Sequence, residues 1–206
     1  MAGHAGNGEE ICGDLGQQGT QMDALGHFGF INQPGESPTY FGGLTQNEVV
    51  GPTGLLRLGI DKAEPIITSV VLLDAASYVN NSQALAPGYA ITPQDIEEDI
   101  LAAQGLAQRG IKAGDAVFIH TGSGAAWVHS PATYYTQGRL SYDAAVYLAA
   151  KKIVLVGLDN PCTDAVVHIP GVGPFPALPS WEHGNNPWLP FGVHHYTLTQ
   201  AGVHQM

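Results

Sequence analysis

The apolar positions of the chain fall into short runs separated by polar segments rich in glycine and proline. Three runs are dense in β-branched residues: Ile66 to Leu73, which ends at Asp74, Ala116 to His120, and Ile153 to Leu158. Continuous apolar runs of this length are typical of strands that are covered on both faces. We therefore expect three buried strands.

Two helices are indicated by their end signals. Thr92 can cap a helix whose first residue is Pro93 and whose first turns are acidic, with Gly110 as its C-cap. Ser141 can cap a second helix that has a face of small residues. A leucine-rich stretch closed by glycine predicts a short helical turn. The expected ranges are 53–59 for the turn, 93–109 for the first helix and 141–150 for the second.

These elements fit one α/β or α+β domain of 206 residues. Residues 1–15 show no periodic pattern and are expected to be poorly ordered. Residues 160–192 are rich in proline and glycine, which predicts a long loop excursion. The domain therefore has a sheet core with irregular regions at both ends.

Composition narrows the functional classes. The chain is 44% hydrophobic and 12% charged, with a formal net charge of -11. Such an acidic protein would be repelled by phosphate backbones and anionic membranes, so nucleic-acid and membrane partners are not expected. There is no signal-peptide pattern at the start. Cys12 and Cys162 lie far apart and in no metal-binding spacing, so we expect free buried thiols and a cytoplasmic location.

The segment from Gln17 to Phe28 carries the densest set of candidate ligands. If it is extended, Gln17, Gln21 and Asp23 point to one side, and His27 joins them if the alternation persists. Carboxylate, imidazole and amide oxygen suit a divalent cation such as Zn²⁺ or Mn²⁺. The spacing matches no standard ligand motif, so a polar strand edge with a capping histidine is an equal alternative.

This segment resembles the signature H-x-G-T-H-x-D-x-x-x-H-F of the metal-dependent cyclase and kynurenine formamidase-like hydrolases. Gln17 and Gln21 stand where the family has histidines. A branch of the family that reads G-T-Q-x-D, which includes trans-dienelactone hydrolases, is similar in this respect. The loss of two imidazoles implies one metal ion instead of two. The matching positions are Gly19, Thr20, Asp23, His27 and Phe28.

A second likeness lies near the other end of the chain. Val193 to Val203 resembles the family segment V-H-x-x-L-L-x-x-N-G-I, whose histidine is a metal ligand, and His194 takes that place. In this register the family's next ligand, a glutamate, would follow Met206, so either the chain is truncated or the ion lacks this carboxylate. Relatives usually carry a segment before the signature, so truncation is expected at the first end as well. We expect this segment to be extended, so that His195 faces away from His194, and we expect His204 to be incidental.

Weaker likenesses lie between the two. The stretch around His120 resembles the family's G-D-V-V-L-I-R-T-G strand beside the active site, so His120 either is near substrate or is only a hydrogen-bonded strand end. Residues 140–159 also resemble a family segment. Tyr40 and Phe41, with Phe28, either wall the site or anchor a loop.

The resemblance implies an α/β swivelling β/β/α cyclase-like fold with a mixed sheet and flanking helices, assembled as a homodimer or homotetramer. It implies hydrolysis of a lactone, lactam or formamide by water activated on one Zn²⁺ or Mn²⁺ ion. The ion would be held by Gln17, Gln21, Asp23 and His194, with His27 as general base or as a further ligand or support. The rivals are an inactive binding or subunit protein and, less favoured, a metal-free hydrolase that uses Ser123.

Overall fold

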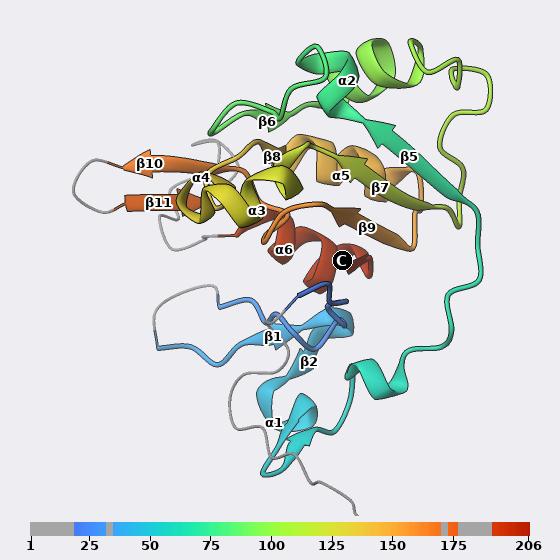
Figure 1. The fold of residues 1–206 in the computed structure, drawn as a ribbon. Coiled ribbons are helices and arrows are strands. Elements are labelled where there is room, and N and C mark those ends of the chain that lie inside the picture. Colours follow the sequence, from blue (N-terminus) through green and yellow to red (C-terminus); the bar gives the residue numbers. More distant parts are fainter. Residues whose placement is uncertain (1–18, 32–34, 170–172, 177–190) are drawn as a thin grey trace, which may run out of the picture.

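The computed structural model describes residues 19–31, 35–169, 173–176 and 191–206, and it has a mixed α/β fold (Figure 1). At its centre is a four-stranded parallel sheet in the order β12-β9-β7-β5. Its strands are β5 (Val70–Asp74), β7 (Ala116–His120), β9 (Leu155–Leu158) and β12 (His204–Gln205). Three of these strands follow the predicted apolar runs, within a few residues at their starts.

The sheet has one face packed into the core. Val71 and Leu73 of β5 and Val117 and Ile119 of β7 join this core with the side chains of the helices. The prediction that β5 is covered on both faces is wrong, because Val70 and Leu72 on its other face are 55% and 54% exposed. β5 is the edge strand, so alternate residues are left facing solvent.

The open edge of β5 is covered by the side chain of Gln104. Its amide nitrogen donates to the Leu72 carbonyl at 2.8 Å, and its amide oxygen accepts from the Asp74 N–H at 2.8 Å. The side chain thus satisfies backbone groups that another strand would otherwise bond.

The helix α5 (Tyr142–Ala150) begins as predicted, with the Ser141 hydroxyl accepting from the Ala144 N–H at 3.1 Å. The other predicted helix is shorter than expected. The chain is helical from residue 93, where the Thr92 hydroxyl accepts from the Asp95 N–H at 3.1 Å as predicted, and it continues as the π-helix η4 (Asp95–Leu101). The chain then continues in turns, and Gly105 has a φ of 73°, which ends the helix before residue 109.

The segment after residue 191 is helical, so the prediction that it is extended is wrong. It forms the short helix α6 (Gly192–His194), which continues into the π-helix η6 (His195–Ala201). The Val193 N–H is capped by the carboxylate of Asp164 from a distant loop, and Gly202 ends the helix at a φ of 71°. A cap that comes from outside the segment leaves no signal in the local pattern.

Smaller elements surround the sheet. The expected helical turn at 53–59 is a hairpin of β3 and β4, because Gly54 has a φ of 145° and turns the chain back on itself. The expected loop at 160–192 includes, in its described part, the antiparallel pair β10 (Val166–Ile169) and β11 (Gly173–Pro176).

The remaining strands and helices are β1 (Thr39–Tyr40), η2 (Phe41–Gly43), β2 (Leu44–Thr45), α1 (Gln46–Val49), β3 (Val50–Gly51), β4 (Gly54–Leu55), η3 (Ile60–Lys62), α2 (Ala75–Val79), β6 (Ala90–Ile91), η5 (Ser123–Ala125), α3 (Ala126–His129), α4 (Pro131–Tyr134) and β8 (Arg139–Leu140).

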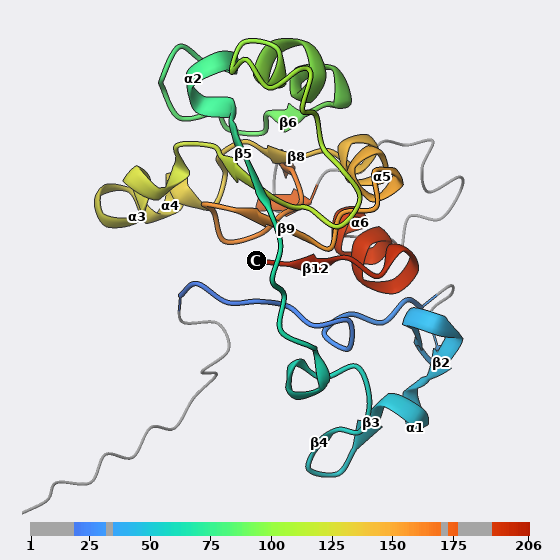
Figure 2. The ribbon, with the colours of Figure 1, turned by 90° about the vertical axis from the view of Figure 1, so that its right-hand side faces the viewer.

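The two ends of the described chain lie side by side. In both ribbon views the segment after residue 19, in blue, runs next to the C-terminal elements, in red (Figures 1 and 2). The contact is an isolated antiparallel bridge in which the Asp23 N–H donates to the Gln205 carbonyl at 2.8 Å. Among the described residues, no helix is both long and apolar enough to cross a membrane.

Candidate metal centre

Asp23 is fixed by backbone contacts to the last strand. Besides its bridge to Gln205, its carbonyl lies 3.1 Å from Nδ1 of His204. Its carboxylate is thereby held at the border between the first described segment and the C-terminal helices. His204, which the sequence left as incidental, therefore helps to place Asp23 from the backbone side.

His27 reaches the same place through a turn. The His27 N–H bonds the Ala24 carbonyl at 2.9 Å, and the Gly26 N–H bonds the Leu58 carbonyl at 2.9 Å. The chain therefore turns after Asp23, so the strand-like alternation that places Gln21 and Asp23 on one side does not persist to His27. The turn still brings the two side chains to one side, with Nε2 of His27 3.9 Å from Oδ2 of Asp23.

His194 comes from the helix α6, and its imidazole is held by Asp164. Nδ1 of His194 bonds Oδ2 of Asp164, while the other carboxylate oxygen accepts from the Val193 N–H at 2.7 Å. A carboxylate only accepts, so Nδ1 donates in this bond, which leaves Nε2 as the nitrogen that faces the centre. Oδ2 of Asp23 is 3.8 Å from Nε2.

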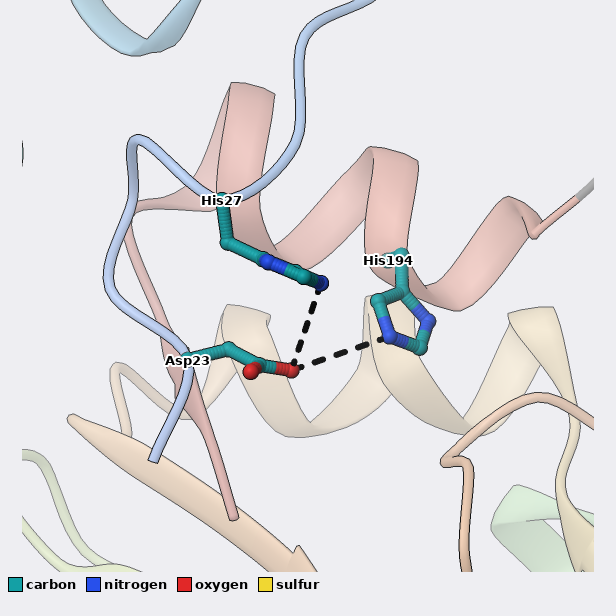
Figure 3. A group of neighbouring side chains, drawn as sticks. All are labelled: Asp23, His27 and His194. Atoms are coloured by element: carbon teal, nitrogen blue, oxygen red, sulfur yellow. Dashed lines mark ion pairs between the residues drawn. The ribbon is translucent and has the colours of Figure 1, made fainter. Parts of the chain in front are cut away.

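These three side chains converge on one point (Figure 3). One ligand atom from each of Asp23, His27 and His194 lies within 4.8 Å of the others. The Asp23 and His194 side chains are 15% and 11% exposed, whereas His27 is 41% exposed. The centre thus has two sheltered ligands and one that is open to solvent.

Gln21 is next to this centre in a different role from the expected one. Its side-chain nitrogen donates to Oδ1 of Asp23 at 3.1 Å, so its amide orients the carboxylate in this structure. Gln17, the other expected amide ligand, lies outside the described residues. Metal coordination by these amides stays a prediction.

Aromatic rings surround His194. The rings of Phe28 and Phe191 each have their centroids 5.6 Å from that of the imidazole. Tyr40 and Phe41, expected as wall residues, have their recorded contacts elsewhere: the Tyr40 hydroxyl donates to Gln46, and the Phe41 ring packs over Gly202. Phe191, which the sequence did not indicate, lies beside the imidazole and also contacts Phe28, with the two ring centroids 6.1 Å apart.

His120 is not part of this cluster in the structure. It ends β7, and its Nδ1 lies 2.8 Å from Oδ1 of Asp74, with Nε2 4.0 Å from Oδ2 of Asp159. Ser123 is fully buried and bonds Thr121, so it has neither the exposure nor the histidine partner of a nucleophile. Both residues lie at the carboxyl ends of the central strands.

A buried polar network behind His194 was missed at the sequence level. The Thr163 hydroxyl donates to the side-chain oxygen of Gln205 at 2.6 Å and lies 3.4 Å from Nδ1 of His194. Asp164 is the main partner, and it is 1% exposed. A signal for it existed, because Asp164 follows β9, and polar residues just past the carboxyl ends of parallel strands commonly build sites.

Cys162 also belongs to this region, and its thiol is free, as predicted. The thiol is half-buried, 3.9 Å from Oδ2 of Asp164, and it belongs to a second group of possible ligands with Asp164 and His194. Burial, reinforced by Asp164, raises the pKa of Cys162 to about 12. The thiol is therefore neutral at pH 7 and reacts slowly unless a cation displaces its proton.

His195 differs from its neighbour His194, because both of its ring nitrogens lie within hydrogen-bond distance of side chains in the same helix. Its ring lies against Phe30 at 4.3 Å, Nε2 accepts from the Gln200 side chain at 2.9 Å, and Nδ1 lies 3.1 Å from the Thr199 hydroxyl. Burial lowers the pKa of His195 to about 4. It is thus a neutral imidazole inside the helix packing and points away from the centre, as expected, although the backbone is helical.

The comparison with protein families decides the relationship. Residues 12–165 match the Cyclase family. The chain belongs to the cyclase family. Comparison with curated proteins gives no match.

Solved structures support the cyclase fold. A crystal structure of a novel cyclase superposes with a TM-score of 0.66 at 21% identity, covering 89% of this chain and 53% of that one. Isatin hydrolase A from Labrenzia aggregata, solved with benzyl benzoate, gives a TM-score of 0.50 at 16% identity, covering 89% and 56%. This cyclase-family chain thus spans about half the length of the solved structures that it matches.

The donor set of the cyclase-family chain fits a divalent cation. Asp23 offers an anionic oxygen, and His27 and His194 offer imidazole nitrogens, which are common ligands for Zn²⁺ and Mn²⁺. Among the described residues, Oδ2 of Asp23 accepts no hydrogen bond and lies 3.8 and 3.9 Å from the two imidazoles. Ligand atoms that are close but not bonded to one another leave room for an ion between them.

Proposed function

We propose that this cyclase-family chain is a metal-dependent hydrolase that opens a cyclic ester or amide, or cleaves a formamide. The convergence of Asp23, His27 and His194 from distant parts of the sequence carries the proposal. An ion held there would lower the pKa of a bound water and polarise the substrate carbonyl. The structural relatives include an isatin hydrolase, whose name refers to a hydrolytic reaction, and this motivates the same reaction class here.

The residues of the chain have separable roles in this proposal. Asp23 and His194 are the sheltered ligands, and Asp164 positions His194 by fixing its tautomer. His27 is the general base: it takes a proton from the attacking water as the C–O or C–N bond breaks and returns it to the leaving oxygen or nitrogen. Its exposure suits proton exchange with solvent.

The apolar rings of Phe28 and Phe191 would receive the flat part of a cyclic or aryl substrate beside His194. Aromatic faces exclude water and orient planar ligands, which favours a ring-containing lactone, lactam or arylformamide. Small-molecule substrates also agree with the acidic charge of the chain.

The decisive experiment measures metal and turnover together. The purified full chain is assayed by elemental analysis and screened against lactones, lactams and arylformamides with Zn²⁺ or Mn²⁺, before and after chelation. We expect near-stoichiometric metal and chelator-sensitive hydrolysis. Metal-free protein that hydrolyses nothing would favour the alternative, a catalytically inactive family member that acts as a binding or subunit protein.

The role of His27 has its own test. His27→Ala is expected to lower turnover by about 10²- to 10⁴-fold, the usual contribution of a general base, with bound metal largely retained. His129→Ala, which changes another histidine at the end of a short helix, is the matched control and should leave both unchanged. Equal loss of metal and turnover in His27→Ala would make His27 a ligand instead.

A further inference from the structure

The imidazole of His194 has a second group of ligand atoms on the side that faces away from Asp23. Cys162 and Asp164 stand two residues apart in the loop after β9, and each offers one ligand atom within 4.8 Å of the other and of His194. Asp164 is 1% exposed and His194 is 8% exposed, whereas Cys162 is half-buried. The group is therefore sheltered but can be reached beside the thiol.

We propose that Cys162, Asp164 and Nδ1 of His194 form a second cation site, selective for thiophilic divalent ions such as Cd²⁺, Co²⁺ and Zn²⁺. We name this the inner site, and we name the group of Asp23, His27 and His194 the outer site. The inner site goes beyond the proposed hydrolase activity and does not depend on it.

The distances are compatible with a tetrahedral ion. Sγ of Cys162 is 3.9 Å from Oδ2 of Asp164. Zinc binds sulfur at about 2.3 Å and oxygen or nitrogen at about 2.0–2.2 Å, which places a tetrahedral S···O pair about 3.5 Å apart. Asp164 and His194 now bond directly, and they would separate by about 1 Å to admit the ion.

Ligand chemistry separates the two sites. The inner site has one sulfur donor, which favours softer ions, whereas the outer site has only oxygen and nitrogen donors and accepts Mn²⁺ as well. Arg139 is a buried cation that donates to the Asp164 carbonyl at 3.3 Å and also hydrogen-bonds the Cys162 side chain, so it adds positive charge directly at the inner site. The Asp164 carboxylate and a Cys162 thiolate together outweigh that charge, so a divalent ion is still attracted.

The two sites compete because they share the imidazole of His194. A cation at Nδ1 displaces the proton of the bond to Asp164, which leaves to solvent with the proton of the Cys162 thiol, and breaks the contact that orients the ring towards Asp23. An ion at the inner site therefore weakens the outer site.

Cobalt spectroscopy of the full chain tests the inner site directly. Co²⁺ added to metal-free wild type should give a thiolate-to-metal charge-transfer band in the near ultraviolet, and Cys162→Ser should lose it. Cys12→Ser removes the other cysteine of the chain and is the matched control, which should keep the band. A band that persists in Cys162→Ser, or that wild type lacks, would overturn the proposal.

Alkylation of the wild-type protein gives a second measurement that does not depend on the folding of a variant. Cd²⁺ should protect Cys162 from alkylation, read by peptide mass spectrometry, whereas Mn²⁺ should not. Saturating Cd²⁺ should also weaken Mn²⁺ binding by roughly 5- to 150-fold, the usual range of coupling between sites. Equal alkylation with and without Cd²⁺ would exclude the inner site, while Mn²⁺ binding and hydrolysis without Cd²⁺ report separately on the outer site.

Discussion

Two aspartate and histidine clusters of this chain differ in how fully their polar groups are paired. In the cluster at the end of the central strands, His120 and Asp74 already bond at 2.8 Å, and both are substantially exposed. In the outer site, Oδ2 of Asp23 stays 3.8 and 3.9 Å from two imidazoles, with its ring partner His194 fixed from behind. The first cluster is a paired surface group, and the second has the spacing that a cation would complete.

The largest expected effect comes from removing the carboxylate of the outer site. Asp23→Asn should abolish stoichiometric metal and lower turnover by at least about 100-fold, since even residues that only support ligands contribute 10- to 100-fold. Asp74→Asn removes the corresponding carboxylate of the paired cluster and is the control. Elemental analysis and turnover numbers compare them, and equal metal loss in both variants would remove the distinction between the clusters.

The next effect concerns the support behind His194. Asp164→Asn keeps an oxygen for the Val193 N–H but no longer fixes the proton on Nδ1 of His194. We expect metal affinity to fall about 10- to 100-fold. Isothermal titration with Mn²⁺ measures it, with Asp143→Asn, in the first turn of α5, as the control. An unchanged affinity would mean that the tautomer of His194 is set by other contacts.

His195 extends the comparison to an imidazole that is paired and buried. Its folded pKa of about 4 is below the ordinary histidine value of 6.5, so the unfolded chain takes up a proton first as pH falls. The contribution of His195 to the free energy of unfolding is therefore complete above pH 6.5, and it decreases by about 2–3 kcal/mol as the pH falls to 4. Urea unfolding from pH 7 to pH 4.5 should show a flatter profile in His195→Gln. The same slope in both proteins would contradict the assigned pKa.

The smallest effect is expected at the paired surface cluster. His120→Asn removes one half-exposed ion pair, and such pairs contribute about 0–1 kcal/mol. Metal content and turnover should stay within error of wild type, and the urea midpoint should move little. A large loss of turnover would place His120 near substrate after all, as its family resemblance suggested.

The sequence predicted the elements whose signals are local. The strands β5, β7 and β9 and the helix α5 follow from apolar runs and a serine cap, which are written in neighbouring residues, whereas the short strand β12 was not predicted. The helix at 192–201 could not be predicted, because its cap is the carboxylate of Asp164, which is far away in the chain. The hairpin at 50–55 was missed because Gly59 suited a helix end, which favoured a helical turn over residues 53–59.

The candidate site shows the same contrast between local signals and contacts from distant parts of the chain. Asp23, His27 and His194 were found through motif resemblance, although the turn that brings His27 beside Asp23 was not. Asp164, Phe191 and Cys162 were missed. The position of Asp164 after β9 was a general signal, but its contact with His194 depends on a helix that the pattern did not indicate. Tertiary contacts, which local propensity does not encode, select these residues.

The bridge between Asp23 and Gln205 has a consequence for synthesis on the ribosome. The first ligand leaves the exit tunnel long before the second, because Asp23 and His194 are 171 positions apart. Closing so long a loop is entropically slow, and the nascent chain cannot retain a cation between these residues until the last turns have docked. Bound metal would therefore serve as a marker of completed folding.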